Sequence, residues 1–545
     1  SLYFYDAHLP IEIDAQNQVF LAGIQLTHAE ANSEKDNKTT NHAFQFALTS
    51  VQFADIKVPV NYHNQALNLD IKRLTLNNLE SWTEEFARLI VHATVNESSL
   101  RSNLQLHLFQ DEPEIIGTFK ASDLNLAELT KIIPDAGFSF ASQLSTDMTF
   151  TIALKKQGLE LFQQGQLKLT TIEFTQQNDQ AKANSLSWRG GVIVKQNSQA
   201  KKGQINLAAN INGELAATDL TATQAGKNAK AASLKWKGDI NLKQQASDKK
   251  TANTTSTKVH TKTVSNLNLV ADIQGQLNAS KVQLNLVTDK DKRSLSFDKL
   301  SANGNTQLDL SDITKVALNQ ALNMQQFTLN DSTQKLNLAA DLHIKTQAKI
   351  NLASDKIDIN HKGDLSASNL KLTQPNLNIG LESFNSEGSA QVKLAKNMAI
   401  KLQQNLQLDK LVLQESQQNL TLNTSANMQA DSQITLKGEQ LALVHEGDIQ
   451  LTQFSASQAM PERALTATLE ALNWQGNLNL QQQDKTNITT TGSVKINNIA
   501  VNNSNLKRKI INSSEISLAQ LSYNPEQEIK AKNLKITDLA IGDKS

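Results

Sequence analysis

Residues that could carry out chemistry are present in this chain, but they are not grouped as catalysis or metal binding requires. The ten histidines are scattered from His8 to His445, and no pair has the spacing of a metal site. There is no cysteine, which excludes disulfides, thiolate metal sites and thiol catalysis. We therefore predict neither a metal nor a cofactor.

Carboxylates and glycines form no catalytic motif either. Asp111, Glu112 and Glu114 surround Pro113, a pattern more typical of a solvated turn than of an acid–base pair. Gly190 and Gly191 lie within alternating sequence and not ahead of a helix, so they do not predict a phosphate cradle. Nucleophile-elbow and Walker motifs are missing. We predict that the protein is not an enzyme.

The composition excludes other classes of protein. Across 545 residues, 53 Lys and Arg balance 53 Asp and Glu, so the basic excess of a nucleic-acid binder is missing. Hydrophobic residues make up 39% and aromatic residues 5%, which is too little bulky apolar material for one thick core. We expect thin layers, one side chain deep.

Most of the chain alternates between apolar and polar residues with a period of two. In Leu67-Asn68-Leu69-Asp70-Ile71 the leucines fall on one face of a strand, and the pattern resumes at Leu74 after an offset that predicts a bulge. Half-buried strands favour antiparallel sheet. We predict a mostly β protein, a long curved antiparallel groove with a few short helices in the N-terminal third. The in-phase apolar residues predicted to line it are Leu67, Leu69, Ile71, Leu267, Leu269, Leu284, Leu286, Leu336, Leu338, Leu406, Leu408, Leu478 and Leu480.

A glycine motif recurs within this alternation. An apolar residue is followed four positions later by Gly and then by more alternation, and three copies place Trp two residues before the Gly. Gly-to-Gly steps such as 363 to 388 and 447 to 476 predict hairpin units of 25–30 residues. Glycine between alternating runs marks a bend or bulge, so we interpret these residues as structural. They are Trp188, Gly190, Trp236, Gly238, Trp474 and Gly476.

The chain divides into two parts by composition. Residues 1–175 predict an α+β start of the groove, and residues 176–545 predict repetitive hairpins. Ser81 to Glu84 resembles a capping box, although a strand through Ile90 is an equal alternative. Asp123 is predicted to cap a helix over 124–133. The polar stretch 246–262 has almost nothing to bury and predicts a disordered loop.

The alternating hairpins, the repeated Leu-x-Trp-x-Gly-x-Ile-x-Leu at Leu234–Leu242 and the stretch Ala121–Leu129 resemble AsmA-like proteins of Gram-negative bacteria. That family comprises the AsmA, TamB and YhdP group and large relatives of unknown function. The resemblance implies a periplasmic body, anchored in the inner membrane by a segment upstream of Ser1. It implies a repeating β-groove that carries phospholipids or other acyl lipids between the inner and outer membranes, with envelope proteins as partners.

Two other functions fit the same sequence pattern. A scaffold for outer-membrane assembly without lipid cargo needs the same ribbon, because leucine-lined grooves and leucine-filled sandwiches have the same alternation. A surface adhesin built as a β-solenoid is the other alternative. Against it, the chain has only 21 glycines for the tight corners of a solenoid.

Overall fold

The structure, a computed structural model, is built almost entirely from β-strands. It describes the whole chain except residues 14–18, 26–44, 63–64, 131–136, 157, 198–205, 246–267, 288–291, 312, 460–463, 483–485, 504–507, 525–526 and 543–545. The predicted disordered loop at 246–262 therefore lies outside the described residues, as does Leu267. The contacts divide the chain into two compact units, Ser1–Ala225 with Ala229–Leu267, and Gly226–Asn228 with Asn268–Ser545.

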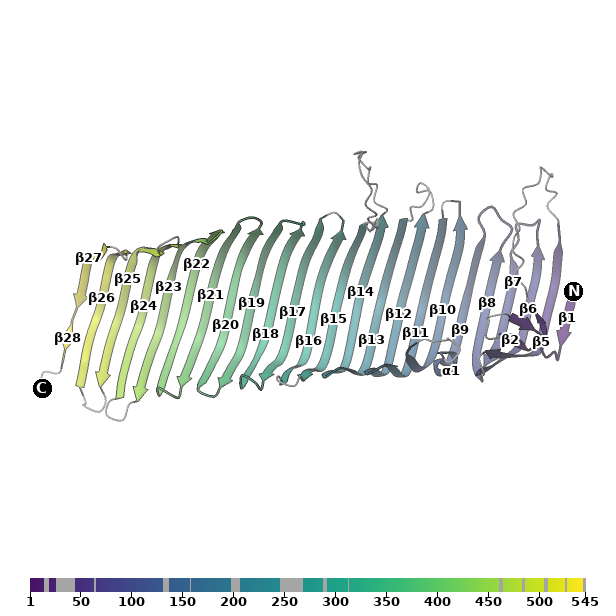
Figure 1. Cartoon of the computed structure of the whole chain (residues 1–545), viewed down its shortest axis with the longest axis horizontal. Helices are drawn as coiled ribbons and strands as arrows, with labels where there is room; N and C mark the ends of the chain where they lie inside the picture. The colour runs from purple at the N-terminus through teal and green to yellow at the C-terminus, as the bar shows by residue number, and fades with distance from the viewer. Residues whose placement is uncertain are drawn as a thin grey trace, which may run out of the picture. The chain divides into compact units, whose positions relative to one another are not determined.

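The first unit contains strands β1 to β14 and the single described helix (Figure 1). The elements are β1 (Leu2–Tyr5), β2 (Ile11–Ile13), β3 (Val19–Leu21), β4 (Ile24–Gln25), β5 (Ala47–Tyr62), β6 (Gln65–Glu80), β7 (Ala87–Val95), β8 (Ser98–His107), β9 (Glu114–Asn125), α1 (Leu126–Thr130), β10 (Ser139–Lys155), β11 (Gly158–Gln176), β12 (Asp179–Asn197), β13 (Asn206–Gln224) and β14 (Lys227–Gln245).

The second unit contains strands only, within the residues that the structure describes. They are β15 (Asn268–Val287), β16 (Lys292–Leu310), β17 (Thr314–Asp331), β18 (Leu336–Leu352), β19 (Ile357–Gln374), β20 (Leu377–Leu394), β21 (Met398–Glu415), β22 (Leu420–Lys437), β23 (Gln440–Ala459), β24 (Ala464–Gln482), β25 (Thr486–Asn503), β26 (Arg508–Asn524), β27 (Gln527–Thr537) and β28 (Ala540–Ile541).

Both units are open, curved sheets in which chain neighbours pair. From β5 to β13, and again from β15 to β27, each strand lies antiparallel to the next. β1 and β2 run parallel to their partner, β5. The predicted mostly β, antiparallel groove architecture is confirmed. Successive antiparallel neighbours are not the coiled rungs of a β-solenoid.

The predicted hairpin unit of 25–30 residues is wrong. Most strands from β10 onward have 17 to 20 residues, so two strands with their turns need more than 40. From β15 to β25, one residue per odd-numbered strand has a φ of about +50°, and these residues recur every 41 to 45 positions. They are Lys281, Gln326, Asn369, Lys410, Gln453 and Asn498.

These left-handed residues are bulges that bend each strand past its middle. Neighbouring side chains satisfy the displaced backbone groups: the Lys410 amide donates to Ser425 Oγ at 3.0 Å, and the Gln326 amide donates to Asp341 Oδ1 at 2.8 Å. The bulge predicted from the offset after Ile71 is confirmed, because the β6–β7 register shifts between Ile71 and Arg73.

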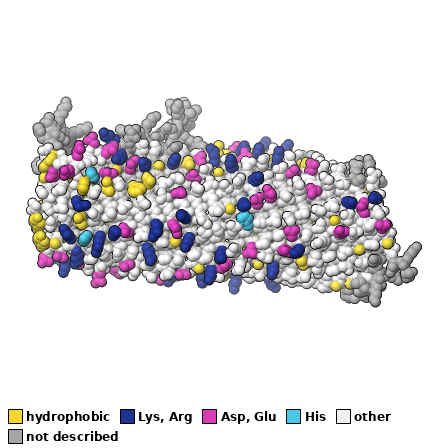
Figure 2. Space-filling view, turned by 180° about the vertical axis from the view of Figure 1, so that it is seen from behind, with side chains coloured by type: hydrophobic (Ala, Val, Ile, Leu, Met, Phe, Trp, Pro, Cys, Tyr) yellow, Lys and Arg dark blue, Asp and Glu magenta, His cyan; other side chains and the backbone are white. Residues whose placement is uncertain are grey.

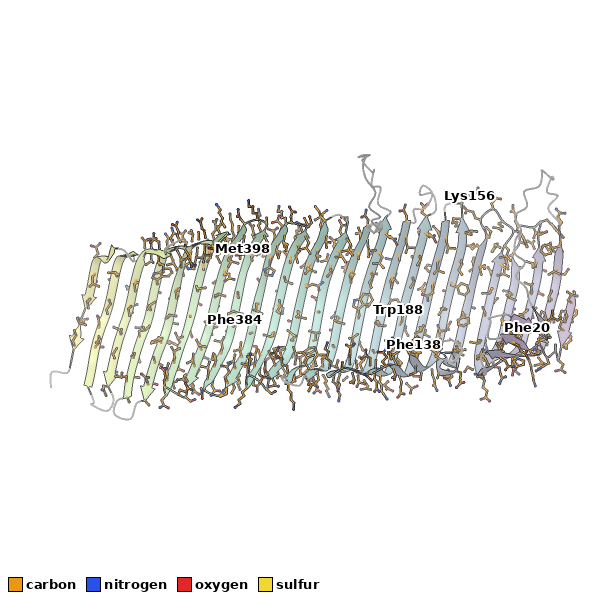
Figure 3. The ribbon with its side chains drawn as sticks, in the orientation of Figure 1. Phe20, Phe138, Lys156, Trp188, Phe384 and Met398 are labelled. Carbon is orange, nitrogen blue, oxygen red and sulfur yellow. The ribbon has the colours of Figure 1, made fainter. Side chains whose placement is uncertain are left out.

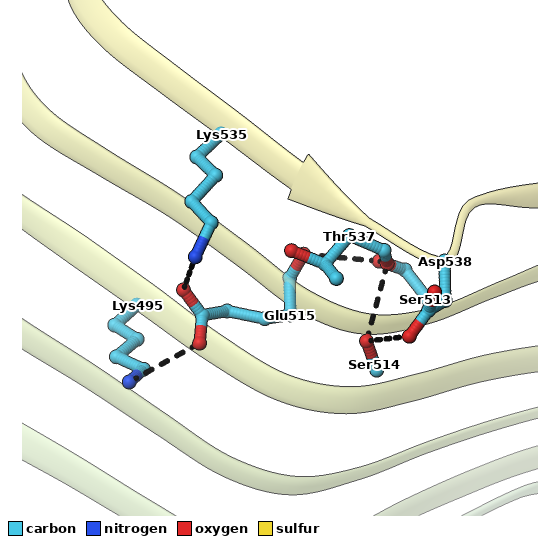
Figure 4. A network of polar contacts seen from close by, with 7 residues as sticks. All are labelled: Lys495, Ser513, Ser514, Glu515, Lys535, Thr537 and Asp538. Atoms are coloured by element: carbon cyan, nitrogen blue, oxygen red, sulfur yellow. Dashed lines mark hydrogen bonds and ion pairs between the residues drawn. The ribbon is translucent and has the colours of Figure 1, made fainter.

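Hydroxyl groups stabilise the same bends from the adjacent strand. Figure 4 shows the curve of β26, where Ser513, only 1% exposed, donates to the Thr537 carbonyl at 2.7 Å. Ser142 and Thr424 make the same kind of bond, to the carbonyls of Thr170 and Thr452. These hydroxyls take the place of ladder bonds that a bulge disrupts.

One of the two predicted helices is wrong. The Ser81 hydroxyl accepts the Phe46 amide at 3.0 Å and does not cap a helix, and the chain continues into strand β7, the alternative interpretation. The second helix exists as α1, but Asn125 caps it by accepting the Ala127 amide at 3.0 Å. Asp123 is instead a bulge residue with a φ of 51°. The predicted end of this helix lies outside the described residues.

Candidate functional site: an apolar groove face

The strand register of the second unit aligns apolar side chains into rows that cross the sheet. One row, here called the isoleucine lane, joins directly paired residues of eleven successive strands. Paired residues in antiparallel strands project from the same face, so the lane is continuous. Its members are Ala271, Leu308, Val316, Ile350, Ile359, Val392, Ile400, Ile434, Leu443, Leu480 and Ile488.

A second row, the leucine lane, lies beyond the bulges. Each bulge inserts one residue, so the apolar side chains stay on the same face although the alternation slips by one in the sequence. Its members are Leu284, Leu295, Leu329, Leu338, Leu372, Ile379, Leu413, Leu422, Ala456, Ala467 and Val501. Neither lane contains a charged side chain.

Between the lanes runs a row of small and polar residues, here called the glycine crease. In β15 to β25 it reads Gly275, Gly304, Gln320, Thr346, Gly363, Gly388, Gln404, Ala430, Gly447, Gly476 and Gly492. In the first unit Gly165, Gly190 and Gly213 align in the same way.

The crease is where the apolar face is concave. A Cβ atom added at Gly363, Gly388 or Gly447 would lie 2.2–2.3 Å from a carbonyl oxygen of the adjacent strand. Such crowding arises on the inside of a bend, and glycine relieves it because it has no side chain. The apolar face therefore lines the inside of the curved sheet.

Tryptophan rings cover the glycines on this inner face. A Cβ at Gly190 or Gly213 would come within 2.7 Å of the Trp188 ring, and one at Gly476 within 3.1 Å of Trp474. The Trp474 ring also stacks on His445, with centroids 6.3 Å apart. Figure 3 shows Trp188 and Phe384 partway along β12 and β20, and Met398 at the end of β21. Of the other residues interpreted as structural, Trp236 and Gly238 lie in β14.

No second layer packs over the inner face among the described residues. Of the 17 buried hydrophobic residues in the described part of the chain, eleven are alanines, and Leu381 is the only larger one among the described residues of the second unit. Large side chains remain open to solvent: Leu284 is 42% exposed and Leu286 is 46% exposed. A closed sandwich would bury such residues almost completely. The face is an open groove.

The predicted lining residues of the second unit all project from this face. Leu284 and Leu338 belong to the leucine lane and Leu480 to the isoleucine lane. The others lie in rows beside them: Leu269, Leu286, Leu336, Leu406, Leu408 and Leu478. They are spread along the sheet and form no single pocket.

The predicted residues of the first unit lie in a better-packed region. Leu67, Leu69 and Ile71 pair with Val60, Val58 and Ile56 of β5. Ile56 is 1% exposed and Val58 is 6% exposed, so this end of the sheet has a small core. Apart from Leu480, the members of the isoleucine lane were not predicted, because they lie outside the repeated leucine pairs of the sequence.

The outer face is polar. Figure 2 shows it covered by uncharged polar side chains with scattered cations and anions. In the first unit a hollow of about 620 Å³ on this face is lined by Lys120, Asp147, Arg189 and Glu214 among others. Lys120 and Asp147 form an ion pair at 2.8 Å. In the second unit Glu515 bridges Lys495 and Lys535 at 3.4 and 3.5 Å (Figure 4). All three Lys–carboxylate contacts are structural and open to solvent.

Within the described residues, no three His, Asp or Glu side chains gather as a metal site would need. Among the same residues, no helix has the length and hydropathy that a bilayer crossing requires. Comparisons with protein-family models, with curated proteins and with solved structures found no match.

Proposed function

We propose that the groove holds the acyl chains of phospholipids and carries them from strand to strand as a bridge-like lipid-transfer protein. The observation that supports this proposal is the pair of continuous, uncharged apolar lanes, which no layer of the described residues covers. Exposed apolar surface of this extent normally has an occupant, because leaving it in water is unfavourable.

The spacing of the lanes suits a sliding ligand. Neighbouring strands lie about 4.8 Å apart, so an acyl chain of roughly 20 Å touches about four strands at once. Each methylene removed from water contributes about 0.8 kcal/mol, which is enough in total to retain the chain. A step of one strand along the isoleucine lane replaces one aliphatic contact by another, so successive positions have similar free energies.

The proposal includes the cellular location that the AsmA-like resemblance implies. We propose that the protein lies in the periplasm and is anchored in the inner membrane by a segment outside this chain. It passes phospholipids to the outer membrane. The polar outer face suits an aqueous compartment, and the inner lanes suit hydrocarbon. A scaffold without cargo has no use for an uncovered apolar lining.

The test is the lipid content of the purified, detergent-free protein, measured by solvent extraction and mass spectrometry. We expect several phospholipids per chain. Leu406→Asp places a charge on the inner face and should reduce the bound lipid, whereas Gln407→Asp, on the outer face of the same strand, should not. Lipid-free protein, or equal lipid in both variants, would support the scaffold function instead.

A further inference from the structure

One edge of the first unit carries exposed aromatic and aliphatic side chains at consecutive strand ends. We call this surface the aromatic rim. Five residues form the rim, and the solvent-exposed fraction of each is 50% for Trp82, 40% for Phe86, 38% for Leu108, 45% for Phe109 and 56% for Leu154.

Contacts between the loops hold the rim in place. The Ser81 amide donates to the Phe46 carbonyl at 3.0 Å, and the Phe46 ring meets the Phe109 ring edge-on at 5.6 Å. The Gln110 side chain donates to the Glu84 carbonyl at 2.9 Å. The Leu154 amide donates to the Pro113 carbonyl at 2.8 Å. The apolar groups are therefore presented on an ordered support, which reduces the entropy lost on binding.

The other described hairpin ends offer an internal comparison. In the second unit, the ends at 332–335, 353–356, 395–397 and 416–419 contain no aromatic residue and consist mostly of Ser, Asp, Asn, Gln and Lys. Hairpin ends of this fold do not need exposed rings. Several large apolar side chains exposed together on a surface often mark an interaction site.

The rim is flanked by acidic groups. Glu84 and Glu85 are exposed beside Trp82. Lys155 and Lys156 lie nearby but are paired with Glu112 at 3.2 Å and Asp111 at 3.9 Å. Backbone donation from Lys156, reinforced by Lys155, lowers the pKa of Glu112, so this carboxylate is charged at neutral pH.

We propose that the aromatic rim docks a protein partner through a short amphipathic helix whose apolar face is flanked by Lys or Arg. The rings supply the apolar anchors typical of interface hot spots, and the acidic border selects a basic partner. An anionic membrane surface is disfavoured, because the same carboxylates would repel its headgroups.

The proposal is tested with two labelled helical peptides that share a Leu/Phe face, one flanked by Lys and the other by Glu. Binding to the full chain is followed by fluorescence anisotropy. We expect the Lys peptide to bind at least tenfold more tightly than the Glu peptide, and more weakly as salt increases. Trp82→Ser with Phe109→Ser should weaken binding at least tenfold. Ile313→Ser, at an exposed position of the second unit, is the matched control and should have no effect.

A charge variant keeps the test independent of the rings. Glu84→Lys with Glu85→Lys leaves every apolar group in place and should reverse the preference between the peptides. Unchanged binding by the ring variant, or equal binding of both peptides, would overturn the proposal. Ring-dependent binding to phosphatidylcholine vesicles with no peptide binding would overturn it in favour of membrane docking. Bound lipid in the groove, measured separately, should be the same in all these variants.

Discussion

Replacing Gly388 by Ala tests whether the glycine crease creates the curvature of the groove. The added Cβ would lie 2.3 Å from the Gln403 carbonyl oxygen and 3.2 Å from the Gln404 Cα on the adjacent strand. To restore ordinary contact, β20 and β21 must separate by roughly 1 Å. Overpacking of this kind costs about 1–3 kcal/mol.

Gly380→Ala is the matched control, because it makes the same change in the same strand. A Cβ at position 380 has no atom within 4 Å. Without a clash, Ala restricts the unfolded chain and stabilises by about 0.4–1 kcal/mol. The two variants should therefore differ in local stability by about 1.4–4 kcal/mol, although the chemical change is the same.

Hydrogen exchange measured by mass spectrometry over 377–415 is the appropriate assay, because a chain of repeated strands need not unfold in one step. We expect amides of β20 and β21 to exchange about 30-fold faster in Gly388→Ala than in Gly380→Ala, which corresponds to about 2 kcal/mol. Equal exchange in the two variants would refute the argument that crowding on the concave face requires glycine in this row.

Two further changes test the polar contacts that hold the strand ends. Asp331 accepts the backbone amides of Gln334 and Thr333 and pairs with Arg293 at 3.0 Å; the backbone bonds are the main reason that its pKa is lowered. Its stabilisation is therefore present above the usual carboxyl pKa of about 4 and is lost as pH falls through the lower folded value. Asp331→Asn should speed exchange at 332–335 at pH 7, and this effect should shrink as pH falls below about 4. An effect that does not depend on pH would contradict this. Ser513→Ala removes the hydrogen bond to the Thr537 carbonyl and should destabilise the β26–β27 bend by about 1 kcal/mol. This loss should appear as faster hydrogen exchange over 508–537. Unchanged exchange would show that the bond contributes nothing to stability.

The fold could be predicted from alternation, because a period of two with one apolar face has few structural solutions. The length of the repeat could not. A bulge such as the one at Lys410 shifts the alternation by one residue, so that the single strand β21 looks like two shorter runs in the sequence. The crease also lacks glycine at Gln320, Thr346, Gln404 and Ala430, so glycine spacing alone gives uneven steps.

The Ser81 prediction failed for a tertiary reason. The sequence contains the residues of a capping box, but the Ser81 hydroxyl accepts a hydrogen bond from Phe46, which is 35 positions away in the chain. Local sequence cannot reveal such a partner. The openness of the groove could not be predicted either, since leucines in an uncovered sheet and in a sandwich alternate in the same way.

Site-specific photo-crosslinking in living cells tests the central claim most directly. Benzoylphenylalanine at Ile400, in the isoleucine lane, should give phospholipid adducts detectable by mass spectrometry. At Lys401, the next residue on the opposite face, it should give none. Phospholipid adducts at Ile400 alone are the result that the groove account predicts. Adducts at both positions, or at neither in a folded and stably expressed protein, would contradict it.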